Sequence, residues 1–451
     1  MKAMIAVVFV ICTWPSVTLG QDTGRMQSMP EMPNMSGTDQ PKSNNSASRL
    51  LTMEPKTFLQ EIVGHDSSGT SAEPNSTATP MRMAQKGQWI LMFHANAFVA
   101  DIQQSSGRGC DKLFSTNWFM PMAQRTLGHG VFTARTMLSL EPATITGERY
   151  PLLFQQGETA YGRPIADGQH PHNLFMEIAA IYDWRIAEHT LISFYAAPVG
   201  DPAIGPTAYP HRASAMEDPV AALGHHQEDS THISDDVFTG GVTYKFVRVE
   251  ASGFHGREPG EFRWGISQGA IDSWSMRATV QPGTDWSGQF SYARITSPEA
   301  LFPNENQQRT TSSAMYDRPL TEGNWANTFV WGRTRSLKDD SVFNSYLFES
   351  LVRFRTKNHV WTRIESAERS NELIVGENPL PPDFAEKSIG HVQAYTLGCD
   401  RDIDLVPHLA SAIGTQFTTY GVPSTLTAIY GTHPFGVVVF LRFRPFSGRE
   451  R

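Results

Sequence analysis

Alternation of apolar and polar side chains along short segments is the feature that most restricts the fold of this chain. From Gln88 to Phe446, segments of about ten residues show it repeatedly, and turn residues separate them. In Trp274–Val280, for example, Trp, Met, Ala and Val alternate with Ser, Arg and Thr. A period of two with one apolar and one polar face is typical of a β-strand whose faces meet different surroundings. The pattern therefore predicts an all-β region.

About 16 strands can be counted, and the segments that connect them alternate in length. The strands are expected to begin near Trp89, Leu113, Gly130, Leu174, His189, Val237, Val247, Ser273, Trp286, Arg309, Asn324, Ser345, Asn358, Gly390, Pro407 and His433. Short turns are expected near Leu127–His129 and Ala187–Glu188, whereas Pro142–Asn173 and Pro198–Asp236 are long. Outer-membrane barrels have short periplasmic turns and longer extracellular loops.

We therefore predict a transmembrane antiparallel up-and-down β-barrel over residues 88–446, located in the bacterial outer membrane. An even number of strands would place both chain ends in the periplasm. A soluble β-sandwich or propeller would explain the strands but not the alternating connections. Aromatic residues near the expected strand ends are predicted to form girdles at the membrane interfaces. They are Trp89, Trp274, Trp286, Trp325 and Trp331.

The chain ends outside the barrel have other features. Residues 1–20 resemble a secretory signal peptide, because Lys2 precedes an apolar stretch and small residues lead up to an expected cleavage after Gly20. Residues 21–48 are a polar, Met-rich tail, which we expect to be disordered because its prolines disfavour a stable helix. Residues 447–451 are expected to form a C-terminal tail.

Residues 49–87 are predicted to hold a short helix and a linker. Glu54–Val63 has its apolar residues on one side of a helix. Ser67–Pro80 is rich in Ser, Thr, Gly and Pro, which is typical of a linker. The helix is expected either to plug the barrel or to lie at its periplasmic rim.

The Met-rich tail is a candidate copper site. Met26, Met29, Met32 and Met35 are spaced by three, and their thioethers are soft ligands that favour Cu(I). In a flexible chain, two or three of these sulfurs can converge on one ion. The alternative is a low-complexity tether in which the methionines have no role. Copper is the one cofactor that the sequence suggests.

Histidines gather in the expected long loops. The Gln-His-Pro-His sequence at Gln169–His172 and the segment His225–His232 each offer two or three ligands within a short span. Imidazole together with carboxylate suits divalent transition metals. The candidate metal ligands are His170, His172, His211, His225, His226 and His232. The alternative is that these residues hydrogen-bond the two loops to each other and to charged strand faces.

Charged residues on polar strand faces are expected to line the lumen, which is wide enough for water in a 16-stranded barrel. They are Arg248, Glu250, Glu349, Arg353, Arg363 and Glu365. Their mixed signs favour a salt-bridged lining or a partial plug over a strongly ion-selective pore.

Two other functions fit the sequence poorly. The formal net charge is −8 and no block of Lys or Arg is present, so nucleic acid is not an expected partner. No phosphate loop occurs. The neighbours His225, His226, Asp229 and Ser230 do not by themselves define a catalytic triad. We expect no enzyme activity.

Six segments of the chain are similar to those of a known family. They are Tyr150–Glu158, Asp167–Glu177, Tyr195–Pro206, Pro210–Pro219, Gly224–Ile233 and Glu250–Trp264. The chain resembles an uncharacterised family of bacterial outer-membrane β-barrel proteins over nearly all of Phe58–Phe446, which implies the barrel fold but no activity. A Met-rich tail ahead of a barrel is also similar in layout to the copper-resistance protein B family, which implies metal handling.

Three functions remain open from the sequence. The first is a porin-like channel that passes small solutes or ions. The second is a barrel that binds or exports copper or another metal ion, with the tail as a periplasmic capture segment or a contact for a periplasmic partner. The third is a structural or surface-binding barrel with a blocked lumen. The two long loops, Pro142–Asn173 and Pro198–Asp236, distinguish these functions by folding into the lumen or away from it.

Overall fold

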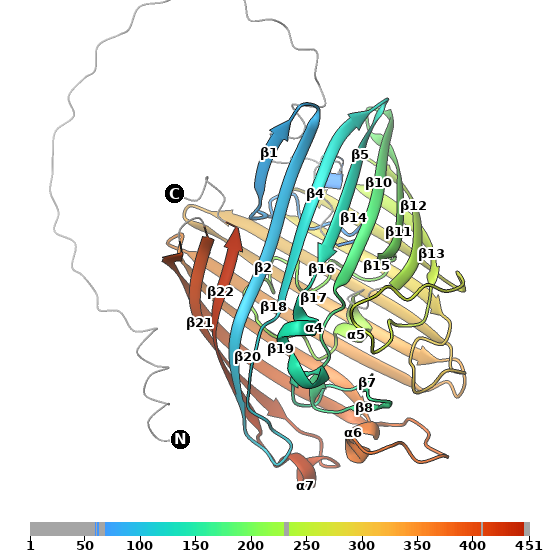
Figure 1. Ribbon diagram of the computed structural model, residues 1–451, viewed down its shortest axis with the longest axis vertical. Helices are drawn as coiled ribbons and strands as arrows, with labels where there is room; N and C mark the ends of the chain where they lie inside the picture. Colours follow the sequence, from blue (N-terminus) through green and yellow to red (C-terminus); the bar gives the residue numbers. More distant parts are fainter. Residues whose placement is uncertain (1–58, 60, 63–67, 230–233, 407–408, 446–451) are drawn as a thin grey trace, which may run out of the picture. The chain divides into compact units, whose positions relative to one another are not determined.

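A computed structural model describes residues 59, 61–62, 68–229, 234–406 and 409–445. These residues belong to one compact unit of the chain, Met53–Arg451. Within the described ranges, no helix combines the length and the apolar character that crossing a bilayer requires. The longest elements are antiparallel strands (Figure 1).

Sixteen strands in the described part of the chain form the wall of a closed barrel, which confirms the predicted fold. Each strand pairs with the next one along the chain. The strands are β2 (Trp89–Gln104), β4 (Asn117–Leu127), β5 (Gly130–Leu138), β10 (Phe175–Ala187), β11 (Thr190–Gly200), β12 (Ser234–Tyr244), β13 (Val247–His255), β14 (Ser273–Gly283), β15 (Trp286–Ile295), β16 (Gln307–Leu320), β17 (Gly323–Ser336), β18 (Val342–Phe354), β19 (Asn358–Ser370), β20 (Ser388–Val406), β21 (Leu409–Gly421) and β22 (Phe435–Pro445).

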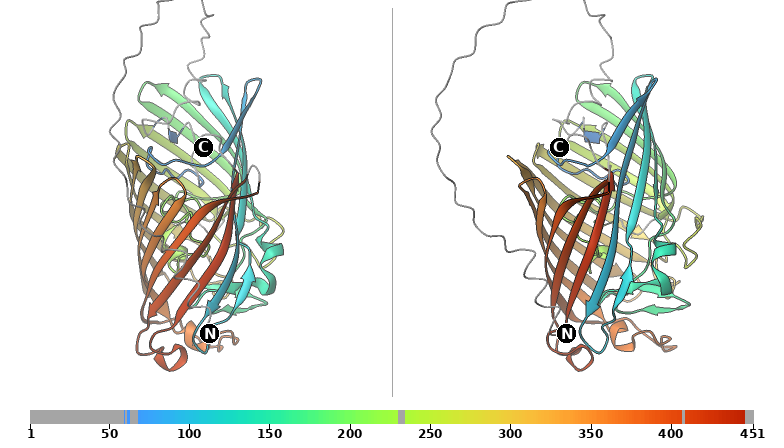
Figure 2. Two further views of the ribbon diagram at one scale, coloured as in Figure 1. Left: turned by 90° about the vertical axis from the view of Figure 1, so that its left-hand side faces the viewer. Right: turned by 60° about the vertical axis from the view of Figure 1, so that its left-hand side comes forward.

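The last strand closes the barrel against the first. β22 lies antiparallel to β2, with Ala97 opposite Phe443 and Gln104 opposite Gly436 (Figure 2). Beyond the end of β22, the short strand β1 (Arg82–Lys86) takes over the same edge of β2. On the other edge, β3 (Lys112–Phe114) continues the line of β4. The pairing leaves no long free strand edge at the seam.

The connections between strands alternate in length, as predicted. At one end of the barrel, strand pairs are joined by turns of two or three residues; we call this the short-turn end. At the other end, the long-loop end, the connections carry the remaining small elements (Figure 1). These are α4 (Glu141–Thr144), η1 (Thr146–Glu148), β6 (Tyr150–Pro151), β7 (Glu158–Ala160), β8 (Arg163–Ile165), β9 (Gly168–Gln169), α5 (His225–Glu228), α6 (Glu372–Val375) and α7 (Thr427–Tyr430).

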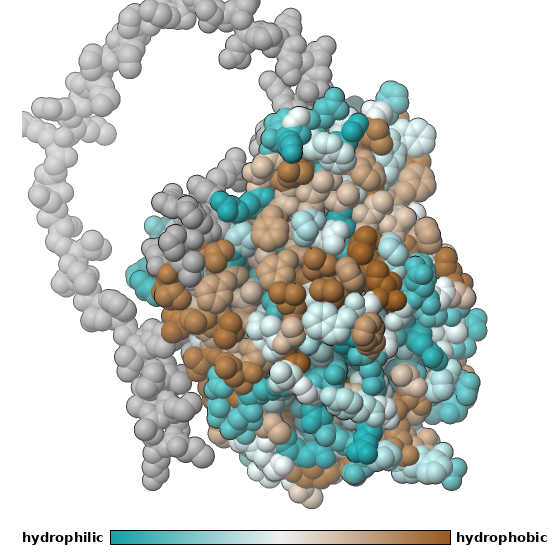
Figure 3. All heavy atoms as spheres, in the orientation of Figure 1, coloured by the Kyte–Doolittle hydropathy of each residue, from teal (hydrophilic) through white to brown (hydrophobic). Residues whose placement is uncertain are grey.

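The outward-facing side chains of the wall are largely apolar. Leu397 is 61% exposed on β20, Met276 is 56% exposed on β14 and Phe290 is 53% exposed on β15. Figure 3 shows hydrophobic residues gathered over the strands, with hydrophilic residues towards both ends. A wall of exposed apolar side chains on a closed barrel is the surface that a lipid bilayer covers.

The predicted tryptophan girdles are present only in part. Trp89, Trp286 and Trp325 lie near the starts of their strands at the short-turn end, and Trp274 lies at the long-loop end of β14. Trp331 lies in the middle of β17, so the predicted position at a strand end was wrong for this residue. The reason is that β17 is 14 residues long and runs past it.

The interior of the barrel is filled by chain and is not an open bore. The connection from β11 to β12 folds inward, and we call its residues 201–229 the inner loop. Ala203, Thr207 and Arg212 of this loop are fully buried. The connection from β5 to β10, residues 139–174, also folds inward, and we call it the mouth loop. Its Leu153 and Phe154 pack into the largest apolar cluster of the protein.

A third segment also lies inside the barrel. Residues 68–80, which we call the inner segment, were expected to form a linker, but most of them are buried. Of the predicted helix Glu54–Val63, residues 59, 61 and 62 are described, and they are helical. Leu59 and Ile62 pack with Val131 and Leu191, which face inward near the short-turn end. Their contacts agree with a helix inside the barrel.

The apolar exterior generates a testable prediction. We expect Leu397→Arg to lower the free energy of unfolding in lipid vesicles by about 2–4 kcal/mol, because it places a charge on the lipid face near the middle of a strand. Tyr161→Arg, at an exposed loop position, is the matched control and is expected to have little effect. Unfolding by guanidinium, followed by tryptophan fluorescence, measures the free energy of unfolding of both variants. An equally small loss of stability in the two variants would contradict a lipid-facing wall.

Candidate functional site

The charged residues that were predicted to line the lumen point into the barrel. Five of the six are each at most 4% exposed: Arg248, Glu250, Glu349, Arg363 and Glu365. The sixth, Arg353, lies near the short-turn end of β18 and is half-buried. Several of them contact the inner loop or the inner segment. The interior is thus a salt-bridged lining around a plug, which is one of the two arrangements expected from the mixed signs.

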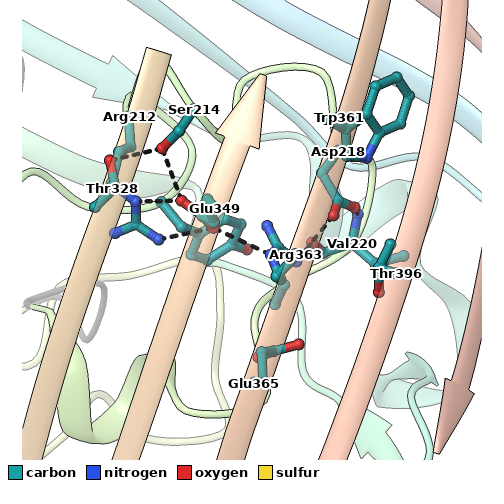
Figure 4. Close-up of polar contacts among 12 residues, drawn as sticks. Arg212, Ser214, Asp218, Val220, Thr328, Glu349, Trp361, Arg363, Glu365 and Thr396 are labelled. Carbon is teal, nitrogen blue, oxygen red and sulfur yellow. Dashed lines mark hydrogen bonds and ion pairs between the residues drawn. The ribbon is translucent and has the colours of Figure 1, made fainter. Parts of the chain in front are cut away.

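A buried ion-pair network centred on Glu349 ties the inner loop to the wall (Figure 4). Arg212 of the inner loop donates to both carboxylate oxygens, at 2.8 and 3.1 Å. Arg363, opposite Glu349 on β19, donates to the same carboxylate at 3.0 Å and pairs with Asp218 of the inner loop at 3.0 Å. Ser214 adds a hydrogen bond of 2.9 Å. Removing one partner of such a buried pair typically costs about 3–5 kcal/mol, because the other charge stays buried.

A second network holds the inner loop closer to the short-turn end. Arg444 on β22 donates to both carboxylate oxygens of Glu217, each at 2.8 Å. Arg442 contacts Glu217 as well and donates to Asp400 at 2.7 Å. His359 on β19 lies 2.6 Å from the same Asp400. The inner loop is therefore anchored to β18 and β19 on one side and to β22 on the other.

Arginines of the wall hold the inner segment through its backbone. Arg135 donates to the carbonyl oxygen of Gly69. Arg248 donates to the carbonyl of Thr70 at 3.1 Å, and Arg277 donates to its hydroxyl at 2.9 Å. Small residues let the guanidinium groups reach the main chain. Buried carbonyl groups need such partners, and here the wall supplies them.

A glycine on β17 allows α5 to lie directly on the wall. A Cβ atom at Gly332 would be 2.2 Å from the carbonyl oxygen of Gln227. Any larger residue at this position would push the helix backbone away from the strand. Gly332 therefore sets how closely the inner loop approaches β17.

Two cavities inside the barrel lie on opposite sides of the inner loop. The one at the long-loop end has a volume of about 640 Å³, and the one at the short-turn end about 610 Å³. Leu223 and His226 of the inner loop line the first, and Ala213 and Glu217 line the second. The inner loop is therefore a partition between the two ends of the barrel.

The cavity at the long-loop end carries more carboxylates than arginines. Its charged lining consists of Glu258, Glu299, Glu305, Glu368 and Glu386 against Arg309 and Arg369. Burial, reinforced by neighbouring carboxylates, raises the pKa of Glu299 to about 8. Glu299 is therefore largely uncharged at neutral pH. The cavity becomes fully negative, and attractive to cations, only as the pH rises through about 8.

Three carboxyl groups of the plug favour their protonated form. Burial raises the pKa of Glu228 to about 8, although it accepts a hydrogen bond of 2.6 Å from Ser345. Burial also raises the pKa of Glu73 to about 8 and that of Asp201 to about 7. Proton binding therefore stabilises the docked inner loop and inner segment.

The structure separates most of the predicted histidine ligands. Each has its own neighbour: His172 lies 2.9 Å from Glu141, His211 lies 2.9 Å from the sulfur of Met137, and His225 lies 2.8 Å from Gln169. These contacts match the alternative interpretation, in which histidines hold the loops together. His232 and the four methionines of the tail, Met26, Met29, Met32 and Met35, lie outside the described residues.

Two of the histidines come together with a carboxylate that sequence reasoning missed. Glu158 Oε1 lies 3.0 Å from Nε2 of His170 and 3.6 Å from Nε2 of His226. Glu158 and His170 belong to the mouth loop, and His226 belongs to α5 of the inner loop. This cluster could not be predicted from the sequence, because it depends on both loops folding into the same end of the barrel.

No family model and no curated protein matches the chain. Among solved structures, the anion-selective porin from Comamonas acidovorans is 12% identical, with 79% of this chain and 99% of that chain covered and a TM-score of 0.49. OprB of Pseudomonas putida is 9% identical, with 79% and 94% covered and a TM-score of 0.48. OmpF of Salmonella typhi, in complex with daunomycin, is 8% identical, with 80% and 100% covered and a TM-score of 0.47. The barrel assignment rests on the chain's own strand pairing.

The raised pKa of Glu228 predicts that the inner loop loosens at high pH. A group with a pKa raised from 4.5 to about 8 in the docked state contributes stability that is complete below pH 4.5 and is lost as the pH rises through 8. Between pH 7 and 9, ionisation of Glu228 is expected to lower the equilibrium constant for docking of the inner loop about tenfold. Hydrogen exchange of amides in residues 201–229, corrected for the intrinsic rate, measures it.

Glu228→Gln is expected to reduce this pH difference, because the amide does not ionise. Glu322→Gln, in an exposed turn at the short-turn end, is the matched control. If both variants keep the full pH difference, Glu228 is not the group that responds.

Proposed function

We propose that this protein is a channel of the bacterial outer membrane whose lumen is kept nearly closed by its own inner loop and inner segment. The apolar exterior and the closed strand pairing support insertion in a bilayer. The polar interior supports passage of small solutes or ions. By the usual architecture of such barrels, the short-turn end faces the periplasm and the long-loop end faces outward.

One observation carries the proposal: the inner loop separates two cavities that carry charged side chains, one at the long-loop end of the barrel and one at the short-turn end. The contacts that fix this partition are ion pairs and hydrogen bonds, such as those of Arg212 with Glu349, together with apolar packing of Val220 and Leu223 in the largest apolar cluster. Water and ions can replace the polar contacts where solvent in the cavities reaches them.

Above about pH 8, entry at the long-loop end favours cations, because the carboxyl groups that predominate in the cavity there are then ionised. In the cavity at the short-turn end, the charged residues are Arg353, Arg442 and Arg444 against Glu217 and Asp402. The two ends thus carry opposite balances of charge. We expect weak overall selectivity and small currents.

A sealed barrel that serves as a structural or surface-binding protein is the second candidate. The complete burial of Arg212 and Asp229 in the inner loop favours it, because such residues rarely move as a group. Metal handling through the Met-rich tail remains a prediction from the sequence, since the tail lies outside the described residues.

Conductance through planar bilayers distinguishes a closed channel from a sealed barrel. We expect the wild-type protein to show small, infrequent openings. Replacing residues 203–224 by a short Gly-Ser linker is expected to raise the conductance several-fold, because it removes the partition. If the wild-type protein and the shortened variant both insert and neither conducts, the channel proposal is wrong.

A point substitution tests the same proposal without shortening the chain. Gly332→Val is expected to increase the open fraction, because the side chain displaces Gln227 and with it α5. Gly240→Val, on β12, has no atom within 4 Å of the added Cβ and is the matched control. An unchanged open fraction in Gly332→Val, with α5 shown to be displaced by hydrogen exchange, would contradict a gating role for the inner loop.

A further inference from the structure

We propose that Glu158, His170 and His226 bind one divalent transition-metal ion at the long-loop end of the barrel. Their ligand atoms all lie within 4.8 Å of one another. Glu158 begins β7, His170 follows β9, and His226 lies in α5. The proposal rests on the geometry of these side chains and is independent of channel activity.

The spacing of the ligand atoms fits a small metal ion. Glu158 Oε1 is 3.0 Å from His170 Nε2 and 3.6 Å from His226 Nε2. A tetrahedral ion bound at about 2.0–2.1 Å holds its nitrogen and oxygen ligands about 3.3 Å apart. These two distances lie on either side of that value, and the ligand atoms of all three residues lie within 4.8 Å of one another. Two histidines and one glutamate form a known zinc ligand set that leaves a fourth position for water.

The hydrogen bond at Nδ1 of His170 directs the lone pair of its Nε2 to the proposed site. Nδ1 of His170 lies 2.9 Å from the carbonyl oxygen of Pro171. Because a carbonyl only accepts, Nδ1 carries the proton and donates, which leaves Nε2 facing Glu158. Metal-bound histidines are commonly oriented by such a bond at the other nitrogen. A nitrogen lone pair and a carboxylate oxygen at 3.0 Å require a cation between them, either a proton on the ring or a metal ion.

Access also favours a metal ion at this site. His226 lines the carboxylate-rich cavity at the long-loop end, so an ion that enters this cavity reaches the site. Arg263 is 3.9 Å from Oε2 of Glu158, the oxygen that faces away from the histidines. The oxygen close to both imidazoles is Oε1.

A second group in the described chain has similar ligand spacing but a different environment. Glu217, His359 and Asp400 also lie within 4.8 Å of one another. However, Arg442 contacts both carboxylates and Arg444 forms a bidentate pair with Glu217. These guanidinium groups already compensate the negative charge and would repel a cation. We therefore assign the metal to Glu158, His170 and His226 alone.

A bound ion would join the mouth loop to the inner loop. Nitrogen and carboxylate ligands suit Zn²⁺ and Co²⁺, whereas the thioethers of the tail suit Cu(I). Zn²⁺ and Co²⁺ are thus probes that distinguish this site from the Met-rich tail.

Metal titration of the full chain, refolded in detergent, tests the proposal. We expect one Zn²⁺ per chain in competition with a fluorescent chelator. Co²⁺ is expected to give the visible absorption bands of a four-coordinate site. His170→Ala combined with His226→Ala is expected to weaken Zn²⁺ binding at least about 100-fold and to abolish these bands, because two of three ligands are lost. Glu158→Gln is expected to weaken it about 10- to 100-fold.

Two controls keep the result interpretable. His433→Ala, at an exposed histidine, is expected to bind Zn²⁺ like the parent protein, and so is a chain without residues 21–48. Heat-modifiable migration on gels shows that each variant has folded. Absence of a Zn²⁺ site in the folded parent, or equal affinity in the parent and the double histidine variant, would overturn the proposal.

Discussion

The contact of Arg212 and Arg363 with the single carboxylate of Glu349 is the interaction on which the interior of this barrel depends. A sixteen-stranded wall encloses more space than its own side chains fill. Here the inner loop occupies that space, and its Arg212 and Asp218 supply the charges that the wall residues Glu349 and Arg363 require. Glu349 and Arg363 also pair with each other on the wall, and Arg212 pairs with Asp229 within the loop. Docking joins these two ion pairs into one buried network. Loop and wall therefore stabilise each other.

The barrel itself could be predicted from the sequence, because one local rule decides it. In Trp274–Val280 every second side chain meets lipid, so the period of two is visible in any single strand. The inner segment shows no such pattern. A stretch of Ser, Thr, Gly and Pro has the same composition whether it is a solvated tether or a buried strap. It is held inside the barrel by Arg135 of β5, Arg248 of β13 and Arg277 of β14, which lie far from it in the sequence.

The candidate metal site illustrates the same limit. His170 and His172 are separated by Pro171 alone, yet they contact different carboxylates, Glu158 and Glu141. Sequence spacing indicated that imidazoles gather in these loops, but it did not indicate which of them share a ligand sphere. That choice depends on how the mouth loop and α5 fold against each other, which is a property of the whole interior.

The charged contacts of the plug respond to conditions that its apolar contacts do not. The contacts of Glu349 weaken with ionic strength only where water reaches them, and burial keeps most of them dry. The raised pKa of Glu228 makes protons a second stabilising ligand of the inner loop. A metal ion would be a third stabilising ligand, bound by Glu158, His170 and His226 at the long-loop end. All three act on the same element, because the inner loop is the one segment in the described chain that contacts the wall network, the buried carboxyl groups and the mouth loop together. Docking of the inner loop therefore combines these electrostatic contacts with apolar packing of Val220 and Leu223.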